Sequence, residues 1–304
     1  MSHTITLDTL SETLRQMAPR RRVAIASPAD DHTIEVATHA IAEGVADLLL
    51  VIERDRAAQA ERLKEDHAEH VTLYYTDTPE ESAATAVALV REGKANVLMK
   101  GTLNTDVLLR AVLNKQQGLL RPGQVLTHVA VAQTPRYPKP LMFSDAAVIP
   151  YPTLDQMDAI LHYALSLWRQ MSDGTPRVAL IHCTEKTSEK FPQTIAYAEL
   201  CRRAEAGAYG EAFVSGPMDV KTACDAESAR IKGIASPVVG AADMLLFPDI
   251  EAANTFYKTI TLFADATVAG MLCGTTAPVV VASRADTAES KYHSLALACL
   301  ASLA

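Results

Sequence analysis

Ser283 and Arg284, near the carboxyl end of the chain, carry a hydroxyl and a guanidinium, two groups that suit the binding of a phosphate. They follow the apolar, β-branched run 277–282, which predicts a buried strand. Asp286 and Glu289 have the spacing of a capping box and predict that a helix begins there. A strand end that precedes a helix N-terminus attracts anions. The alternative is a structural arginine that pairs with a surface carboxylate.

Three other predicted strands also end on polar residues. These residues are Lys100, Gly101 and Thr102, the segment 182–188 with Thr184 and Lys186, and the segment 215–217. Each could be an ordinary loop that only caps the next helix. Because parallel strands end at the same edge of a sheet, the four sets together predict a polar cleft that binds a ligand.

Asn254 and Lys258 form a further candidate pair. They are four residues apart in a predicted helix, so they lie one turn apart on the same face. Asparagine is unfavourable inside a helix, which indicates that another interaction favours it at this position. The alternative is a surface lysine beside an incidental asparagine.

The elements that must position these residues alternate along the chain. Strands are predicted at 22–26, 46–52, 71–75, 96–99, 177–181, 211–214, 243–247 and 268–273, with helices between most of them. A short amphipathic helix is predicted over residues 1–20. The prolines of 134–140 separate two adjacent strand-like runs, 127–133 and 141–148, and predict a hairpin. The abundance of Ala, Val and Leu favours an α/β fold, with helices packed on a parallel sheet.

Composition excludes several classes of protein. A formal net charge of −8 argues against nucleic-acid and membrane-surface partners, which need a basic surface. The five cysteines have neither zinc-ligand spacing nor the pattern of a disulfide framework. The sequence contains no GxGxxG, P-loop, HExxH or GxSxG motif. With no signal-like apolar segment at the start of the chain, we expect a cytoplasmic protein.

Several segments resemble the phosphate acyltransferase family, which comprises the phosphate acetyltransferases and phosphate butyryltransferases. The matching segments are Lys100-Gly101, residues 144–148, 150–153, 215–217, 236–240, 248–254, Tyr257-Lys258, 263–266, 283–286 and 289–291. The resemblance runs from about residue 20 to the end of the chain. The motif PDIEAxN with the following YK, combined with SRAD, is highly specific.

The resemblance implies two α/β lobes with doubly wound sheets, like those of isocitrate and isopropylmalate dehydrogenases. We assign residues 1–124 with 284–304 to one domain and 125–283 to the other, with the active-site cleft between them. The resemblance also implies transfer of a short acyl group, acetyl or butyryl, between phosphate and coenzyme A. No metal or permanently bound cofactor is expected, since coenzyme A is a substrate, and a homodimer or larger homo-oligomer is expected.

The family pattern assigns roles to individual residues. Ser283 and Arg284 would contact the acyl phosphate, with Glu289 as a candidate catalytic group. The expected substrate-binding residues are Lys100, Gly101, Thr102, Thr184, Lys186, Asn254 and Lys258.

The chain departs from the acetyltransferase pattern at two positions. Acetyltransferases have an aspartate, proposed as the base for the thiol, seven residues after the serine, and this chain has Ser290 there. Lys221 stands where the family usually has aspartate after the Gly-Pro segment. The Lys100-Gly101 and SRAD forms are closer to the butyryltransferase branch. One alternative is an acyl-CoA-binding relative without activity; another is an NAD- and metal-dependent hydroxy-acid dehydrogenase with the same fold.

Overall fold

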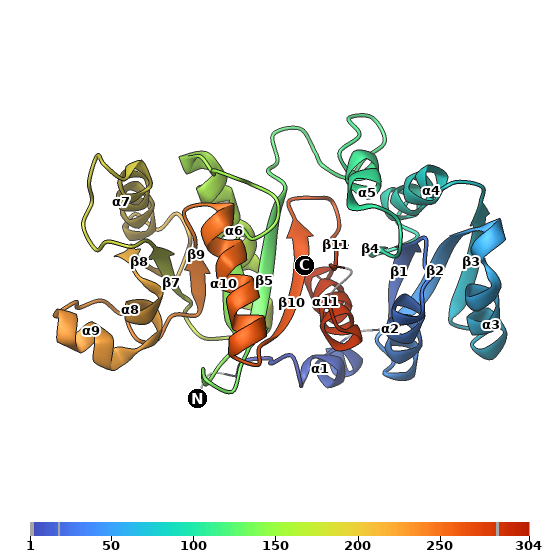
Figure 1. Cartoon of the computed structure of the whole chain (residues 1–304), viewed down its shortest axis with the longest axis horizontal. Helices are drawn as coiled ribbons and strands as arrows, with labels where there is room; N and C mark the ends of the chain where they lie inside the picture. The colour runs from blue at the N-terminus through green and yellow to red at the C-terminus, as the bar shows by residue number, and fades with distance from the viewer. Residues whose placement is uncertain (1–2, 18, 284–285, 304) are drawn as a thin grey trace. The chain divides into compact units, whose positions relative to one another are not determined.

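The computed structural model describes residues 3–17, 19–283 and 286–303 (Figure 1). Its packing divides the chain into two compact units. The terminal unit consists of Leu7–Leu126 and Ala269–Ala304, and the middle unit of Met1–Thr6 and Thr127–Val268. Both units combine a largely parallel sheet with helices, which confirms the predicted α/β class. The domain boundaries at residues 124 and 284 stay a prediction.

The sheet of the terminal unit has the order β3-β2-β1-β4-β11-β10. Neighbouring strands are parallel except β10 and β11, which are antiparallel. The strands are β1 (Arg21–Ala26), β2 (Ala46–Glu53), β3 (Val71–Thr76), β4 (Val97–Lys100), β10 (Thr267–Cys273) and β11 (Val279–Val280). All residues of β4 are buried, as expected for a central parallel strand that is covered on both faces.

The strand order places helices on both faces of this sheet. The connections β1–α2–β2 and β3–α4–β4 cross the sheet in opposite directions, so right-handed crossovers put α2 and α4 on opposite faces. In addition, α11 packs against α1 and α2, whereas α4 packs against α5. The helices are α1 (Leu10–Met17), α2 (Asp31–Ala42), η1 (Arg54–Arg56), α3 (Ala58–Asp66), α4 (Pro79–Arg91), α5 (Thr105–Val112) and α11 (Ala288–Ala301).

The middle unit has a sheet of order β5-β6-β9-β7-β8, in which only β5 and β6 are antiparallel (Figure 1). The predicted hairpin is therefore confirmed. The strands are β5 (Thr127–Gln133), β6 (Leu141–Ser144), β7 (Arg177–Ile181), β8 (Phe213–Met218) and β9 (Met244–Leu246). The helices are α6 (Leu154–Met171), α7 (Pro192–Glu205), α8 (Val220–Cys224), α9 (Ala226–Lys232) and α10 (Ile250–Phe263).

Several predicted element boundaries were wrong. The amphipathic helix predicted over residues 1–20 is limited to α1, and Ile5 before it donates its backbone N–H to the Met171 carbonyl at 2.7 Å. Between β8 and β9 the chain forms two short helices, α8 and α9, instead of one, because Asp225 caps the start of α9. Helix α3 was not predicted. Among the described residues, no helix combines the length and the apolar character that a bilayer crossing requires.

The strand predicted over 141–148 ends at Ser144. The side chain of the next residue, Asp145, forms hydrogen bonds with the backbone N–H groups that would otherwise continue the strand. The Asp145 carboxylate is 3 % exposed and accepts a hydrogen bond from the Thr127 hydroxyl at 2.7 Å. It also accepts the backbone N–H groups of Ala147, Val148 and Ile149 at 2.9, 2.9 and 3.2 Å. Asp145 thus stabilises the turn after β6.

We predict that Asp145→Asn destabilises the protein by about 2–4 kcal/mol, because the amide nitrogen cannot accept hydrogen bonds from these donors. Urea denaturation followed by circular dichroism would measure the change. The control is Asp173→Asn at an exposed position, which should change the free energy of unfolding by less than about 0.5 kcal/mol. Equal stability of the two variants would contradict the role given to Asp145.

Candidate functional site

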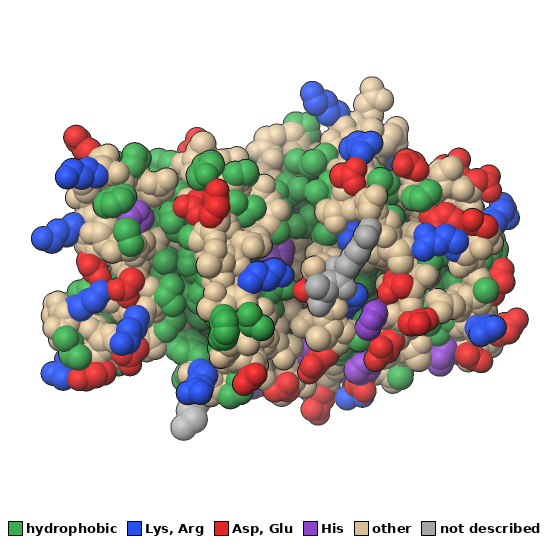
Figure 2. Space-filling model, in the orientation of Figure 1, with side chains coloured by type: hydrophobic (Ala, Val, Ile, Leu, Met, Phe, Trp, Pro, Cys, Tyr) green, Lys and Arg blue, Asp and Glu red, His purple; other side chains and the backbone are tan. Residues whose placement is uncertain are grey.

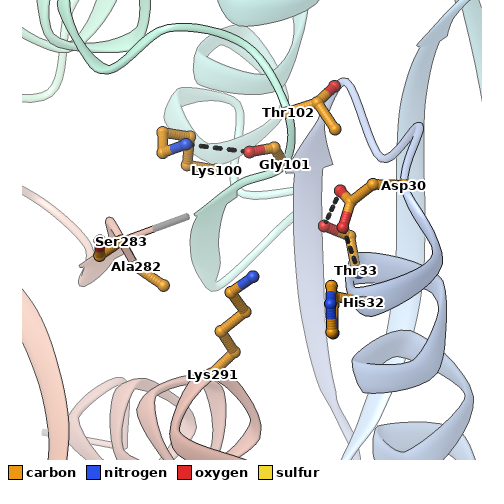
Figure 3. Close-up of a pocket in the computed structure, with 9 residues that line it drawn as sticks. All are labelled: Asp30, His32, Thr33, Lys100, Gly101, Thr102, Ala282, Ser283 and Lys291. Atoms are coloured by element: carbon orange, nitrogen blue, oxygen red, sulfur yellow. Dashed lines mark hydrogen bonds between the residues drawn. The ribbon is translucent and has the colours of Figure 1, made fainter. Parts of the chain in front are cut away.

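A cavity of about 380 Å³ lies within the terminal unit (Figure 3). We call it the lysine cavity; its lining residues are Asp30, His32, Thr33, Lys100, Gly101, Thr102, Ala282, Ser283 and Lys291. They come from the ends of β1, β4 and β11 and the starts of α2 and α11. Strand β4 lies between β1 and β11 and is parallel to both, so the three strands end at one edge of the sheet. The predicted polar edge is therefore present in this unit, and it brings Lys100, Gly101, Thr102 and Ser283 together.

Lys100 is the last residue of β4, and its side chain is buried, with 6 % exposed. Its ammonium donates hydrogen bonds to the carbonyl oxygens of Gly101 at 3.0 Å and Leu103 at 3.2 Å (Figure 3). These contacts hold the long side chain in one conformation beside the cavity. An anion bound there would interact strongly with the charge, because there is little water to screen it.

The loop after β4 is held against the end of β1. Gly101 donates its backbone N–H to the Ala26 carbonyl at 2.8 Å, and Thr102 donates its own to the Ser27 carbonyl at 2.8 Å. The Thr102 hydroxyl also donates to the Ser27 carbonyl, at 2.9 Å. A Cβ atom at Gly101 would lie 2.2 Å from that carbonyl oxygen, so only glycine fits this close approach.

The start of α2 forms another wall of the lysine cavity. Asp30 is the N-cap, and its carboxylate accepts the Thr33 backbone N–H at 3.0 Å and the Thr33 hydroxyl at 2.5 Å (Figure 3). The Asp30 carboxylate is thus held by its own helix. His32, which is exposed, also lines the cavity.

The turn before α11 brings Ser283 to the cavity. The Ser283 backbone N–H donates to the Asp286 carboxylate at 2.7 Å, and Asp286 donates its backbone N–H to the Ser283 carbonyl at 3.2 Å. The predicted Asp286–Glu289 capping box was wrong: the N-cap is Thr287, whose hydroxyl accepts the Ser290 N–H at 3.1 Å. The Asp286 carboxylate instead stabilises the preceding turn. Arg284 lies outside the described residues.

Lys291, in the first turn of α11, contributes a second buried ammonium to the cavity. Its side chain is 8 % exposed and points away from α11 toward the end of β4 and the first turn of α2 (Figure 3). The lysine cavity is therefore lined by two lysines whose side chains are largely removed from water.

Glu289 lines a different cavity of about 510 Å³, which we call the acidic cavity. Its lining includes Asp8, Glu12, Glu35, Tyr292 and His293. The Glu289 carboxylate lies 3.8 Å from the His293 imidazole, whose pKa is lowered by burial. Acidic and histidine side chains gather over α1, α2 and α11 (Figure 2). The structure therefore does not bring Glu289 together with Ser283, and its catalytic role stays a prediction.

The other predicted binding residues belong to the middle unit. Thr184 and Lys186 lie in the loop after β7, where the Lys186 backbone N–H donates to the Thr184 hydroxyl at 3.2 Å. The Lys186 side chain is exposed. Strands β7 and β9 are parallel, so this loop and the start of α10 follow strand ends at the same edge of the middle unit's sheet.

Asn254 and Lys258 lie on successive turns of α10, as predicted. The Asn254 amide donates to the Ala146 carbonyl at 3.0 Å and so joins α10 to the turn that Asp145 stabilises. This contact explains the presence of asparagine inside a helix. The Lys258 ammonium lies 4.0 Å from the centre of the Tyr257 ring, and its side chain is otherwise exposed.

Sequence reasoning missed Asp30, His32 and Thr33, although the rule that found the other sites applied to them. They follow the end of β1, just as Gly101 and Thr102 follow the end of β4, so the same rule predicts that they lie at the ligand-binding edge of the sheet. Among the described residues, no group of three His, Cys, Asp or Glu side chains is arranged to hold a metal ion.

The fold and the lysine cavity define an α/β protein with cationic side chains at the carboxyl edge of a parallel sheet. The family described as phosphate acetyl/butaryl transferase matches residues 75–299. The chain is 35% identical to a phosphate butyryltransferase of Clostridium acetobutylicum over 280 residues, which cover 92% of this chain and 93% of that protein. It is 36% identical to a phosphate acetyltransferase of Rhizobium meliloti over 296 residues, which cover 96% and 92%.

A solved structure with a similar fold is a branched-chain phosphotransacylase from Enterococcus faecalis V583. Its TM-score is 0.81 at 29% identity, over 93% of this chain and 99% of that one. The chain therefore belongs to the phosphate acetyl/butyryl transferase family, as the sequence motifs predicted.

We predict that Gly101→Ala destabilises the protein by about 3 kcal/mol, because the new Cβ would overlap the Ser27 carbonyl. Thermal unfolding would measure the loss. The control is Gly93→Ala, whose Cβ would meet nothing within 4 Å and which should lose only about 1–2 kcal/mol through its positive φ of 70°. A Gly101→Ala variant as stable as this control would refute the close packing of the loop on β1.

Proposed function

We propose that this protein is a phosphate acyltransferase that moves a short acyl group between coenzyme A and inorganic phosphate. Family membership carries this proposal, and the lysine cavity supports it, because it offers buried cations at a sheet edge. In the reaction, a phosphate oxygen attacks the thioester carbon, the carbon–sulfur bond breaks, and coenzyme A leaves as a thiolate that takes up a proton. The products are an acyl phosphate and free coenzyme A.

Each candidate site residue is proposed to have its own role in this reaction. Ser283 donates a hydrogen bond to the phosphate, and Arg284 neutralises it through two parallel hydrogen bonds, which a lysine could not reproduce. Lys100 places a further positive charge beside the phosphate, and Gly101 and Thr102 shape the loop that holds it. The remaining proposed substrate contacts are Thr184, Lys186, Asn254 and Lys258.

The absence of an aspartate at position 290 is compatible with catalysis. A thiol with a pKa of about 8.5 is partly ionised near neutral pH, so forming the thiolate costs only about 2 kcal/mol. A preorganised donor directed at developing charge contributes roughly 3–4 kcal/mol, and positioning two substrates can contribute more. The hydrogen-bond donors and cations of the site therefore contribute more to the rate than a base at position 290 would.

Two further features of the protein belong to the proposal. Burial raises the pKa of the Cys224 thiol to about 11 and that of Cys299 to about 12, so these thiols stay protonated and do not compete with coenzyme A as nucleophiles. All five cysteines are free, as a reducing cytoplasm would leave them. A homo-oligomer is proposed because Leu262 and Phe263, at the end of α10, are 72 % and 78 % exposed.

The test is turnover of acetyl-, propionyl-, butyryl- and branched acyl-CoA with phosphate, followed as released thiol. We expect activity on at least one of them, and its absence with all four would favour an acyl-CoA-binding relative without activity. Family membership does not favour the NAD-dependent dehydrogenase alternative. Reduction of NAD that EDTA abolishes would support that alternative.

We predict that Arg284→Lys lowers kcat/KM by about 10²-fold or more, because lysine cannot form two parallel hydrogen bonds to the phosphate. Arg121→Lys, at an exposed position of the same unit, is the matched control and should keep full activity. Circular dichroism would verify that both variants fold. Wild-type activity in Arg284→Ala would end the assignment of this residue.

A further inference from the structure

We propose that Lys291 binds the phosphate that receives or donates the acyl group, as a second buried cation beside Lys100. This inference rests on the proposed function and adds to it a residue that determines the affinity for phosphate. The observation behind it is the burial of the Lys291 side chain, which is 8 % exposed and lines the lysine cavity. Within the described part of the chain, its ammonium makes no hydrogen bond or ion pair.

An ammonium on a largely buried side chain with no protein partner is unfavourable, because only the water that enters the cavity can compensate its charge. Helix α11 is buried over most of its length, from Lys291 to Leu300, so an apolar residue at position 291 would suit the packing better. Among the described residues that line the cavity, the one carboxylate belongs to Asp30, which is held by Thr33 as a helix cap. A ligand that brings negative charge into the cavity would remove this cost.

The chemistry of the cavity identifies that ligand as a phosphate. Lys100 and Lys291 bring positive charge to the cavity and Ser283 brings a hydroxyl, and these groups match the charge and the accepting oxygen atoms of a phosphate dianion. The cavity volume of about 380 Å³ accommodates a phosphate with a short acyl group. Phosphate groups are also present in coenzyme A, so the experiment must separate these two sources.

During transfer, one phosphate oxygen attacks the thioester carbon and the remaining oxygens keep their negative charge. Lys291 holds those remaining oxygens, while the carbon–sulfur bond breaks and the charge moves to sulfur. Lys291 neither gains nor loses a proton in this step. Its removal should therefore weaken phosphate binding and leave the binding of acyl-CoA unchanged.

The first experiment compares the kinetics of the wild-type protein with Lys291→Met, which keeps an unbranched side chain only one atom shorter and removes its charge. We expect KM for phosphate to rise about 10- to 100-fold, the loss typical of one hydrogen bond to a charged group, with an unchanged KM for acyl-CoA. The control is Lys115→Met, which removes an exposed lysine of the same unit and should change neither constant. An unchanged KM for phosphate, or a rise in KM for acyl-CoA alone, would overturn the proposal.

The second experiment measures binding without turnover, as the midpoint of thermal unfolding with and without inorganic phosphate. Phosphate should raise the Tm of the wild-type protein and of Lys115→Met, and this increase should be lost in Lys291→Met. Without phosphate, Lys291→Met should be as stable as the wild-type protein or more so, since a buried unpaired charge is gone. A purely structural lysine would give the opposite result, a lower Tm with the phosphate effect intact, and would refute phosphate binding.

Lys291→Gln provides a second variant if Lys291→Met does not fold, and the same two outcomes apply to it. The failures of the two proposals are distinguishable. If wild-type protein gains stability from phosphate through Lys291 but transfers no acyl group, the acyltransferase function fails and the phosphate site stands. If wild-type protein is active while both Lys291 variants keep the wild-type KM for phosphate, the function stands and this inference fails.

Discussion

The site depends on positive charge held at the edge of a parallel sheet, where little water remains to screen it. Strands β1, β4 and β11 are parallel neighbours, so the residues that follow them meet at this edge. Lys100 is held there by backbone carbonyls of its own loop, and Lys291 reaches the same cavity from α11. Charge in such surroundings interacts more strongly with an anion than the same charge would in water.

The backbone that carries these cations is itself held in place by specific contacts. Gly101 lies so close to the Ser27 carbonyl that a Cβ atom has no room, and Thr102 donates two hydrogen bonds to that same oxygen. The middle unit uses a comparable device. In that unit, the Asp145 carboxylate accepts hydrogen bonds from backbone N–H groups of the turn after β6, and the Asn254 amide donates a hydrogen bond to the Ala146 carbonyl in that turn. In both units, contacts made by the motif residues hold a loop in one conformation, and polar groups lie on or beside that loop.

The alternation of apolar runs and helical patterns was sufficient to predict most strands, the hairpin and the polar strand ends at Lys100 and Ser283. It was insufficient where side chains compete for backbone groups: Asp145 ended a predicted strand early, and Thr287 rather than Asp286 capped α11. The sequence did not predict Lys291 at the lysine cavity, for another physical reason. A lysine in a helix is normally read as facing water, and only the packing of α11 on its neighbours shows that this one is buried. The same packing places Glu289 in the acidic cavity.

The terminal unit is built from two distant parts of the chain, Leu7–Leu126 and Ala269–Ala304, and the second part supplies α11, which is buried from Lys291 to Leu300. During synthesis, the first part leaves the ribosome long before α11 exists to cover its sheet. The middle unit is continuous from Thr127 to Val268 except for a short N-terminal segment, so it can acquire its structure in the meantime. The lysine cavity is therefore completed only after α11 has been synthesised, and until then a nascent chain must protect an incomplete apolar surface.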